Sequence, residues 1–283
     1  MNICIICNET EATSVEHIIP HALGGTLTTK SCCKPCNDLL GSKIDSLLTN
    51  SEELKMVRFL LKIRGKNGVP NPFSKLLDGP YPGIKGYLKF NHEGTYEGFQ
   101  VLTKPIVNTE ERLVIIGESR NKLLQAINKI IKKNNQAEFT IEDLEKNLGP
   151  SIQIGNPQIN IGVNKEMSES FADRVYLAIL KIAYEASLHL LGQEYKSDTT
   201  GNDIRLVLKE VIYGKTNIFR PTRMNFYNLN WENPKRYHSI DFKYESNNLF
   251  CTINLLNFLV VKVLVSKGAQ KYSLSESSIE LTF

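Results

Sequence analysis

Apolar residues recur at helical spacing in four stretches of the chain, and these stretches predict its main helices. Three of them cover residues 37–48, 54–63 and 121–133. The longest covers residues 166–191, and these apolar residues are spaced along it to fill a core: Phe171, Val175, Leu177, Ile179, Ile182 and Leu188. We therefore expect residues 166–191 to form the central helix of the larger domain.

Other stretches show the alternation or the short apolar runs that are typical of strands. Residues 86–102 alternate around His92-Glu93-Gly94 and predict a β-hairpin, and residues 113–116 predict a further short strand. Residues 237–244 and 249–265 predict buried strands, with a turn at residues 246–248. Helices and strands in this order predict an α+β fold.

Glycine and proline are most frequent in residues 65–83, which makes this stretch the predicted linker. A chain of 283 residues has room for one small module and one ordinary domain. We therefore predict an N-terminal module at residues 1–64, a linker at 65–83, and a larger mixed α+β domain at 84–283.

The overall composition narrows the class of protein only slightly. With 41% apolar and 23% charged residues, the chain can bury a core and is expected to fold as a soluble protein. The formal charge of +4 is compatible with a polyanionic partner but does not require one. No membrane attachment is expected, because Met1 begins no signal-like segment and the most apolar run, residues 249–265, is interrupted by polar residues.

Five of the six cysteines fall within the first 36 residues, unlike a disulfide network spread across a secreted domain. The C-x-x-C pairs Cys4/Cys7 and Cys33/Cys36 are 25 residues apart, a pattern typical of tetrahedral zinc sites. We predict a structural Zn²⁺ that helps a module with little core to fold, in the reducing cytoplasm. Cys32 is an alternative to Cys33 as a zinc ligand. Because pairing Cys32 with Cys36 would change the second spacing to C-x-x-x-C, Cys33 is the predicted ligand. Disulfides and free buried thiols are the alternatives.

The residues between and after the two pairs add a second pattern. Residues 16–25 read EHIIPHALGG, the second pair is followed directly by Asn37, and residues 41–45 read GSKID. Together with the cysteines, this pattern resembles the HNH endonuclease family in its zinc-stabilised ββα-metal form. The resemblance covers about residues 1–48, and it implies a small ββα-metal module that hydrolyses phosphodiester bonds.

The resemblance also implies a role for three residues. His17 is the expected general base, Glu16 is the expected ligand of a catalytic Mg²⁺ or Mn²⁺, and Asn37 completes that metal site. An imidazole with a near-neutral pKa can accept a proton from water, and these hard cations prefer carboxylate and amide oxygens. Two positions depart from the family pattern: Glu16 stands where Asp or His is common, and Thr28 falls near the place of the middle Asn.

Four further side chains are candidates for contact with nucleic acid, because cations near the site would neutralise backbone phosphate. These side chains are His21, Lys30, Lys34 and Lys43. The alternative for all four is an ordinary solvated position on the surface.

The expected function is cleavage of DNA in a restriction or phage-defence role, with residues 84–283 recognising the target or activating the nuclease. RNA is an alternative substrate, and assembly as a homodimer is left open. A competing interpretation is a zinc-stapled module that binds DNA or a partner and whose nuclease site is degenerate at Glu16 and Thr28.

Overall fold

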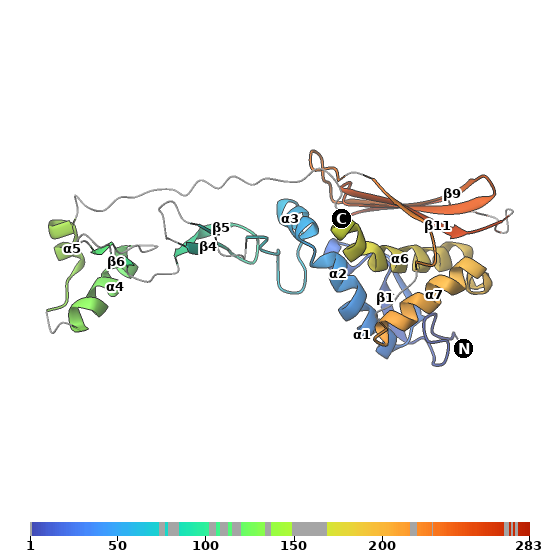
Figure 1. The fold of residues 1–283 in the computed structure, drawn as a ribbon, viewed down its shortest axis with the longest axis horizontal. Coiled ribbons are helices and arrows are strands. Elements are labelled where there is room, and N and C mark those ends of the chain that lie inside the picture. The colour runs from blue at the N-terminus through green and yellow to red at the C-terminus, as the bar shows by residue number, and fades with distance from the viewer. Residues whose placement is uncertain are drawn as a thin grey trace. The chain divides into compact units, whose positions relative to one another are not determined.

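The structure is a computed structural model that describes residues 2–283 except 74–76, 79–84, 102–105, 108–112, 115–119, 134–136, 149–168, 216–219, 228, 269–271, 273, 275 and 276. Its contacts divide the chain into two compact units. Unit 1 comprises Met1–Pro70 and Val163–Phe283, and unit 2 comprises Asn71–Gly162 (Figure 1). Unit 2 is therefore an insertion between the two halves of unit 1.

This division differs from the one predicted from the sequence. Residues 163–283 belong with the N-terminal segment, because a single hydrophobic core contains buried residues of both halves, such as Ile6 and Leu40 with Ile179 and Val261. The predicted linker does coincide with the point where the chain leaves unit 1, at Pro70. An N-terminal module that shares its core in this way does not form a separate body.

The N-terminal half of unit 1 contains a two-stranded hairpin followed by helices. Its elements are β1 (Ser14–His17), η1 (His21–Leu23), β2 (Thr28–Cys32), α1 (Lys34–Leu40), η2 (Gly41–Asp45), α2 (Ser46–Thr49) and α3 (Glu52–Leu60). The strands are antiparallel, and His17 lies opposite Thr28. The predicted helix at 37–48 is longer than expected and has π-helical hydrogen bonding in its middle part, η2. Side chains such as Asp45 are thereby turned from the positions of a regular α-helix.

The C-terminal half of unit 1 combines helices with an antiparallel sheet. Its elements are α6 (Glu169–Leu191), η4 (Gln193–Ser197), α7 (Thr199–Ile212), β8 (Met224–Phe226), β9 (Tyr237–Glu245), β10 (Asn248–Leu255), β11 (Leu259–Ser266) and β12 (Ser278–Thr282). The strand order is β12-β9-β10-β11-β8. Buried and half-buried residues alternate along β10, so one face of the sheet covers the core.

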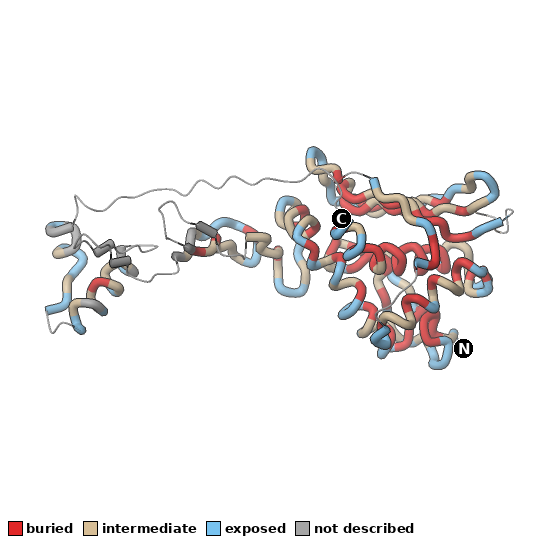
Figure 2. The backbone as a smooth tube through the Cα atoms, viewed as in Figure 1, coloured by how far each residue is buried: buried red, intermediate tan, exposed pale blue. Residues whose placement is uncertain are grey.

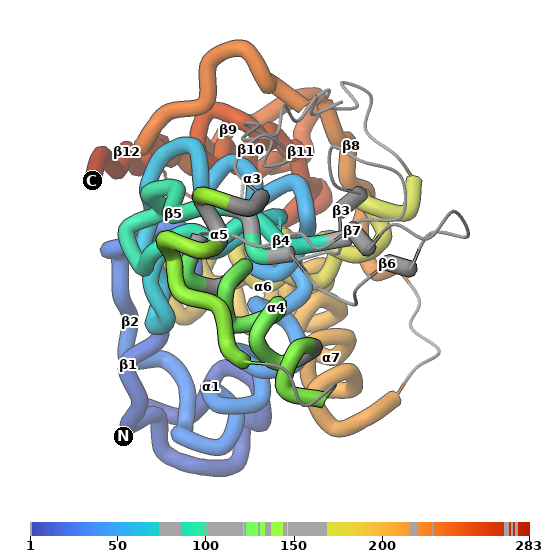
Figure 3. Tube along the Cα trace, turned by 90° about the vertical axis from the view of Figure 1, so that its left-hand side faces the viewer, coloured from blue at the N-terminus to red at the C-terminus, as the bar shows by residue number. Residues whose placement is uncertain are grey.

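The helix α6 lies between this sheet and the N-terminal segment, and the two views of the fold agree on that arrangement (Figures 1 and 3). Nearly every residue from Val175 to Leu188 is buried, as the continuous red of α6 shows (Figure 2). A helix that is apolar on all sides belongs in the middle of a core. The predicted central helix is therefore confirmed, although it packs against both halves of unit 1 and its side chain Leu177 is only partly buried.

Unit 2 contains short strands and two helices. Its elements are β3 (Leu77–Asp78), β4 (Lys85–Phe90), β5 (Tyr96–Val101), β6 (Ile106–Val107), β7 (Leu113–Val114), α4 (Arg120–Lys133) and α5 (Ile141–Leu148). The antiparallel pair β4–β5 turns at Gly94, which has the left-handed φ of 74° that favours glycine. The predicted hairpin and the predicted helix at 121–133 are both present.

The α+β fold class is confirmed, although helix α7 was not predicted and several other elements begin or end at other residues than expected. The run at 249–265 is split into β10 and β11 by Leu256 and Asn257, which both have positive φ. The predicted helix at 166–191 is described only from Glu169 onward, since residues 149–168 lie outside the described part. No helix among the described residues is long and apolar enough to cross a bilayer.

Candidate active site

The two C-x-x-C pairs converge on one buried point. The sulfur atoms of Cys4, Cys7, Cys33 and Cys36 all lie within 4.8 Å of one another. Those of Cys7 and Cys33 are 3.9 Å apart, close to the roughly 3.8 Å that a tetrahedral site with Zn–S bonds of about 2.3 Å requires. Four thiols at this spacing fit a structural zinc ion.

Cys32 lies outside this cluster, in β2 opposite Ser14. Its side chain hydrogen-bonds with that of Cys4, and this bond lowers the pKa of Cys4 to about 3. The same bond, together with burial, raises the pKa of Cys32. Cys32 is therefore a buried hydrogen-bond partner of Cys4 and lies outside the four-cysteine cluster.

Side chains from the C-terminal half hold the peptide carbonyls of the first cysteine pair. Tyr184 donates to Ile5 O at 3.1 Å, and Arg205 donates to Ile6 O at 3.2 Å. Lys196 and Lys209 donate to Ile3 O and Cys7 O, each at 3.2 Å. Three of these four donors are cationic, so they also oppose the net negative charge that four thiolates would place around one zinc ion.

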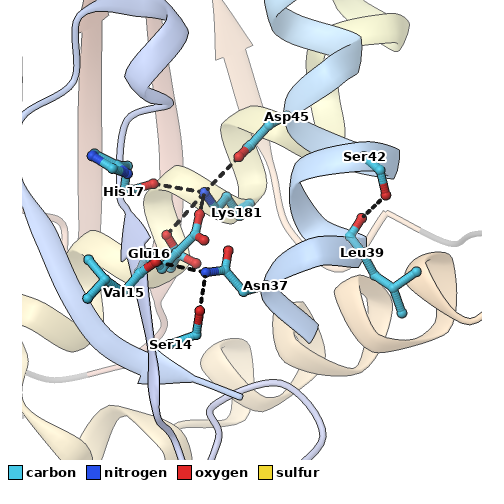
Figure 4. Close-up of polar contacts among 10 residues, drawn as sticks. Ser14, Val15, Glu16, His17, Asn37, Leu39, Ser42, Asp45 and Lys181 are labelled. Atoms are coloured by element: carbon cyan, nitrogen blue, oxygen red, sulfur yellow. Dashed lines mark hydrogen bonds and ion pairs between the residues drawn. The ribbon is translucent and has the colours of Figure 1, made fainter. Parts of the chain in front are cut away.

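Strand β1 presents its last two residues in opposite directions. Glu16 is 4% exposed and faces the core, whereas the ring of His17 points away from it and is half-buried (Figure 4). Burial lowers the pKa of His17, and the neighbouring charges of His21 and Lys181 lower it further. A neutral imidazole at neutral pH is the form that accepts a proton. His17 is thus in the protonation state that a general base needs.

Asn37 connects helix α1 to strand β1. Its Nδ2 donates to Ser14 Oγ at 2.7 Å and to Val15 O at 2.8 Å, where the strand bulges (Figure 4). Because both of these bonds use the amide nitrogen, they fix the side-chain orientation and leave Oδ1 as an acceptor or metal ligand. The structure therefore brings Asn37 next to the strand that carries His17.

Glu16 belongs to a buried cluster of charges around Lys181 of α6. The ammonium bonds to Glu16 Oε1, lies 3.2 Å from Asp45 Oδ2 and 3.4 Å from Glu185 Oε2, and donates to His17 O at 2.9 Å. Figure 4 shows the Lys181 ammonium at the centre of these contacts. The side chain expected as a metal ligand is thus also the partner of a buried lysine.

The charges in this cluster do not balance. Burial raises the pKa of Glu16, of Asp45 and of Glu185. Burial alone would lower the pKa of Lys181, but the three carboxyl groups raise it, so the lysine stays charged. One ammonium is therefore the ion-pair partner of three carboxyl groups. Among the described residues, Oδ1 of Asp45 is buried without a hydrogen-bond partner.

The loop after β1 is fixed from the C-terminal sheet. His238 of β9 contacts Leu23 O through Nε2 at 3.0 Å, and its ring stacks on Phe283 with centroids 5.0 Å apart. Gly24 has a left-handed φ of 89°, and a Cβ there would come within 1.9 Å of the Phe283 ring. A Cβ on Gly25 would come within 1.9 Å of Ile19 O. Close approach therefore requires glycine at both positions, and at Gly24 the left-handed backbone requires it as well.

The predicted nucleic-acid contacts occupy different kinds of position. His21 is exposed, and its ring lies 5.3 Å from that of His17. Lys30 is exposed on β2, and Lys34 pairs with Asp38 on the surface at 2.5 Å. Lys43 instead donates to Ile212 O at 2.6 Å, at the end of α7, so its ammonium has a structural partner.

A hairpin followed by a helix, with four clustered cysteines that fit a zinc ion and a histidine at the strand end, defines a ββα module. Residues 4–52 match the model of the HNH endonuclease family, which confirms the predicted resemblance over this limited N-terminal segment. The segment thus has the features of a nuclease in general. No curated protein and no solved structure is significantly similar to the chain.

Sequence reasoning missed the contribution of the C-terminal half to this site. Lys181 and Glu185 are four residues apart within the otherwise apolar helix α6, on a side that is buried. A charged pair at this spacing inside an apolar helix is a signal of a buried ion pair, because an unpaired charge there would be costly. What the spacing alone does not reveal is that Lys181 also pairs with Glu16 and Asp45.

Proposed function

We propose that unit 1 is a metal-dependent endonuclease that hydrolyses phosphodiester bonds in DNA, with His17 as the general base. The observation that carries the proposal is the half-buried His17, whose pKa is lowered by burial, at the end of the strand to which Asn37 bonds, in the segment that matches the HNH family. RNA is the alternative substrate.

The chemical step needs a base, a nucleophile and a leaving group. His17 takes a proton from a water molecule, whose oxygen attacks the phosphorus as the bond to the leaving oxygen breaks. The leaving oxygen takes up a proton from solvent, and His17 later releases the proton that it gained. Each cycle therefore consumes one water molecule and leaves the enzyme unchanged.

The family implies a catalytic Mg²⁺ or Mn²⁺, and the oxygen donors near His17 fit such an ion in part. Asn37 would hold it through Oδ1, and Glu16 would hold it through the carboxylate oxygen that does not bond to Lys181. When bound, a divalent ion stabilises the negative charge on the scissile phosphate and on the leaving oxygen. The role of Asn37 in this proposal is independent of Glu16, because the two side chains come from different elements.

Zn²⁺ at the four cysteines would have a structural role. It would join the loop before β1 to the start of α1, and so would link the strand that carries His17 to the helix that carries Asn37. Residues 71–162 form a separate unit inserted into the nuclease body, and we propose that they recognise the target or control activity in a restriction or phage-defence setting. A homodimer is compatible with this proposal.

One observation favours a second candidate function. Since the ammonium of Lys181 already neutralises Glu16, the chain could retain the zinc module for binding DNA or a partner while its nuclease site is degenerate. Such a protein would need its zinc ligands but not the imidazole of His17.

The test compares purified, zinc-loaded wild type with His17→Ala and Cys36→Ala on matched DNA and RNA substrates, with Mg²⁺ or Mn²⁺ present. The proposal expects cleavage of DNA by wild type alone, and loss of cleavage on addition of a chelator. If wild type cuts no better than His17→Ala under every condition, the nuclease proposal is wrong. If DNA binding then depends on Cys36 but not on His17, the second candidate is supported.

A further inference from the structure

The buried ammonium of Lys181 joins three elements that the nuclease site depends on. It bonds to Glu16 at the end of β1, to Asp45 in η2 and to Glu185 in α6, and it donates to the backbone oxygen of His17. Lys181 itself is 0% exposed. A single side chain from the C-terminal half therefore contacts both the strand β1 and the helical segment η2 of the N-terminal half.

The bond to His17 O bears directly on the base. A side chain is oriented by the backbone that carries it, and the 2.9 Å bond fixes the peptide of residue 17 from the side opposite to the imidazole. The neighbouring bond to Glu16 fixes the preceding side chain in the same strand. Together they hold both residues of the Glu-His pair from inside the core.

The charge of Lys181 matters as well as its hydrogen bonds. Three carboxyl groups lie within ion-pair distance of its ammonium, and the described residues offer them no second ammonium or guanidinium. Buried carboxyl groups need a partner, so loss of this ammonium would force Glu16 and Asp45 to separate or, once protonated, to find new hydrogen-bond partners. Either change would move the end of β1 relative to α1 and η2.

We propose that Lys181 is a positioning residue of the nuclease site, which holds His17 and Glu16 in their working geometry through the core of unit 1. The inference rests on the proposed function for its kinetic part. It deepens that function, because it makes the C-terminal half a component of the catalytic site and not only a separate domain for recognition.

The test uses the full chain and three variants: Lys181→Met, Lys181→Arg and Lys196→Met. Methionine keeps a stem of similar length without the ammonium, and arginine keeps the charge. Lys196→Met is the matched control, since Lys196 also donates from the C-terminal half to an N-terminal carbonyl, Ile3 O, but away from His17. Each protein is assayed for kcat and KM on DNA, normalised to the folded, zinc-loaded fraction, and for amide hydrogen exchange of residues 14–18.

We expect Lys181→Met to lower kcat by about 100-fold, the loss that a displacement of about 1 Å can cause, with little change in KM. Exchange of residues 14–18 should become faster in this variant. Lys181→Arg should recover part of kcat, and Lys196→Met should keep the wild-type kcat and the wild-type exchange of residues 14–18. A purely structural role would instead lower the folded fraction and leave the normalised kcat unchanged.

Two outcomes would overturn the inference: a wild-type kcat in Lys181→Met, or unchanged exchange of residues 14–18 in that variant. If Lys181→Met does not fold, Lys181→Gln, which keeps a hydrogen-bond donor without the charge, takes its place, and wild-type values of both kcat and exchange in that variant overturn the inference. If wild type itself cuts no better than His17→Ala, the proposed function fails separately. Exchange alone then decides: faster exchange in Lys181→Met but not in Lys196→Met supports positioning by Lys181, and equal exchange overturns it.

Discussion

At the scale of single residues, His238 makes stability depend on pH. It is fully buried, its Nε2 donates to Leu23 O, and its Nδ1 accepts from the backbone of Leu256 at 3.2 Å. This pair of bonds requires the neutral ring, and burial lowers the pKa to about 4. The unfolded chain, in contrast, gains a proton near pH 6.5, the ordinary value for histidine.

We therefore predict that His238 reduces the free energy of unfolding as pH falls from about 6.5 to about 4, by about 3 kcal/mol in total. Above pH 6.5 both states are neutral at this residue and the effect vanishes. Denaturant unfolding of wild type and His238→Gln across this range measures the effect. Carboxyl groups and zinc ligands titrate in both proteins, so the difference between the two pH profiles is the contribution of His238. Parallel pH profiles for the two proteins would show that His238 makes no such contribution.

Single residues also show what a sequence pattern can and cannot indicate. His17, Asn37 and the four zinc-site cysteines were predicted because their roles depend on short spacings within one segment, and the structure brings the cysteines together as expected. The role of Lys181 depends on contacts with residues more than 130 positions away, as its separation of 165 positions from Glu16 shows. No local spacing encodes such a pair.

At the scale of elements, the end of the short helix η1 at Gly24 packs against the ring of Phe283. A Cβ on Gly24 would overlap the Phe283 ring and would also have to adopt a left-handed φ. We predict that Gly24→Ala lowers the free energy of unfolding by roughly 2–4 kcal/mol, since strain and overlap add. Thermal or denaturant unfolding measures this change.

A second substitution separates the two causes. Phe283→Ala removes the ring, so the additional cost of Gly24→Ala in that background should fall to roughly 1–2 kcal/mol, the cost of the left-handed conformation alone. Additive effects of the two substitutions would contradict the contact between Gly24 and Phe283.

Elements with a regular pattern were predictable, and elements shaped by distant contacts were not. The alternation along β10 and the apolar repeat of α6 are properties of each segment alone, so both could be predicted. The π-helical stretch η2 could not, because Lys43 and Asp45 in it have partners in α7 and α6. The helix α7 was missed, although Asp198 caps its start in the ordinary way, by accepting from Thr200 N and Gly201 N.

At the scale of the whole molecule, the two halves of unit 1 depend on each other. The carbonyls of Ile3, Ile5, Ile6 and Cys7 have donors in the C-terminal half, and the core is continuous across both halves. We predict that a fragment of residues 1–70 does not fold even with zinc. Its amide proton spectrum should show little dispersion, and its affinity for zinc should fall below that of the full chain.

The corresponding control is a variant of the full chain that lacks unit 2, with residues 71–162 replaced by a short flexible linker. Because unit 2 has its own contacts, this variant should keep the fold of unit 1 and its zinc site. A fragment of residues 1–70 that folds and cuts DNA at the full rate would show that the N-terminal segment is an independent module after all.

The domain organisation could be predicted only in part for the same reason. The glycine- and proline-rich stretch at 65–83 contains the point where the chain leaves unit 1, at Pro70, and such residues terminate regular structure wherever they occur. The return of the chain to the first unit at about residue 163 depends on the apolar surface that the N-terminal segment offers to α6, and that surface exists only after folding.

The central claim is that His17 acts as the base of a nuclease, and the rate of DNA cleavage by wild type and His17→Ala tests it most directly. The matched control is His21→Ala, which removes an exposed imidazole whose ring lies 5.3 Å from that of His17. We predict that His17→Ala lowers kcat by about 10²–10⁴-fold at equal zinc content and equal folded fraction, whereas His21→Ala retains most of the activity. Equal cleavage rates for wild type and His17→Ala would contradict the claim.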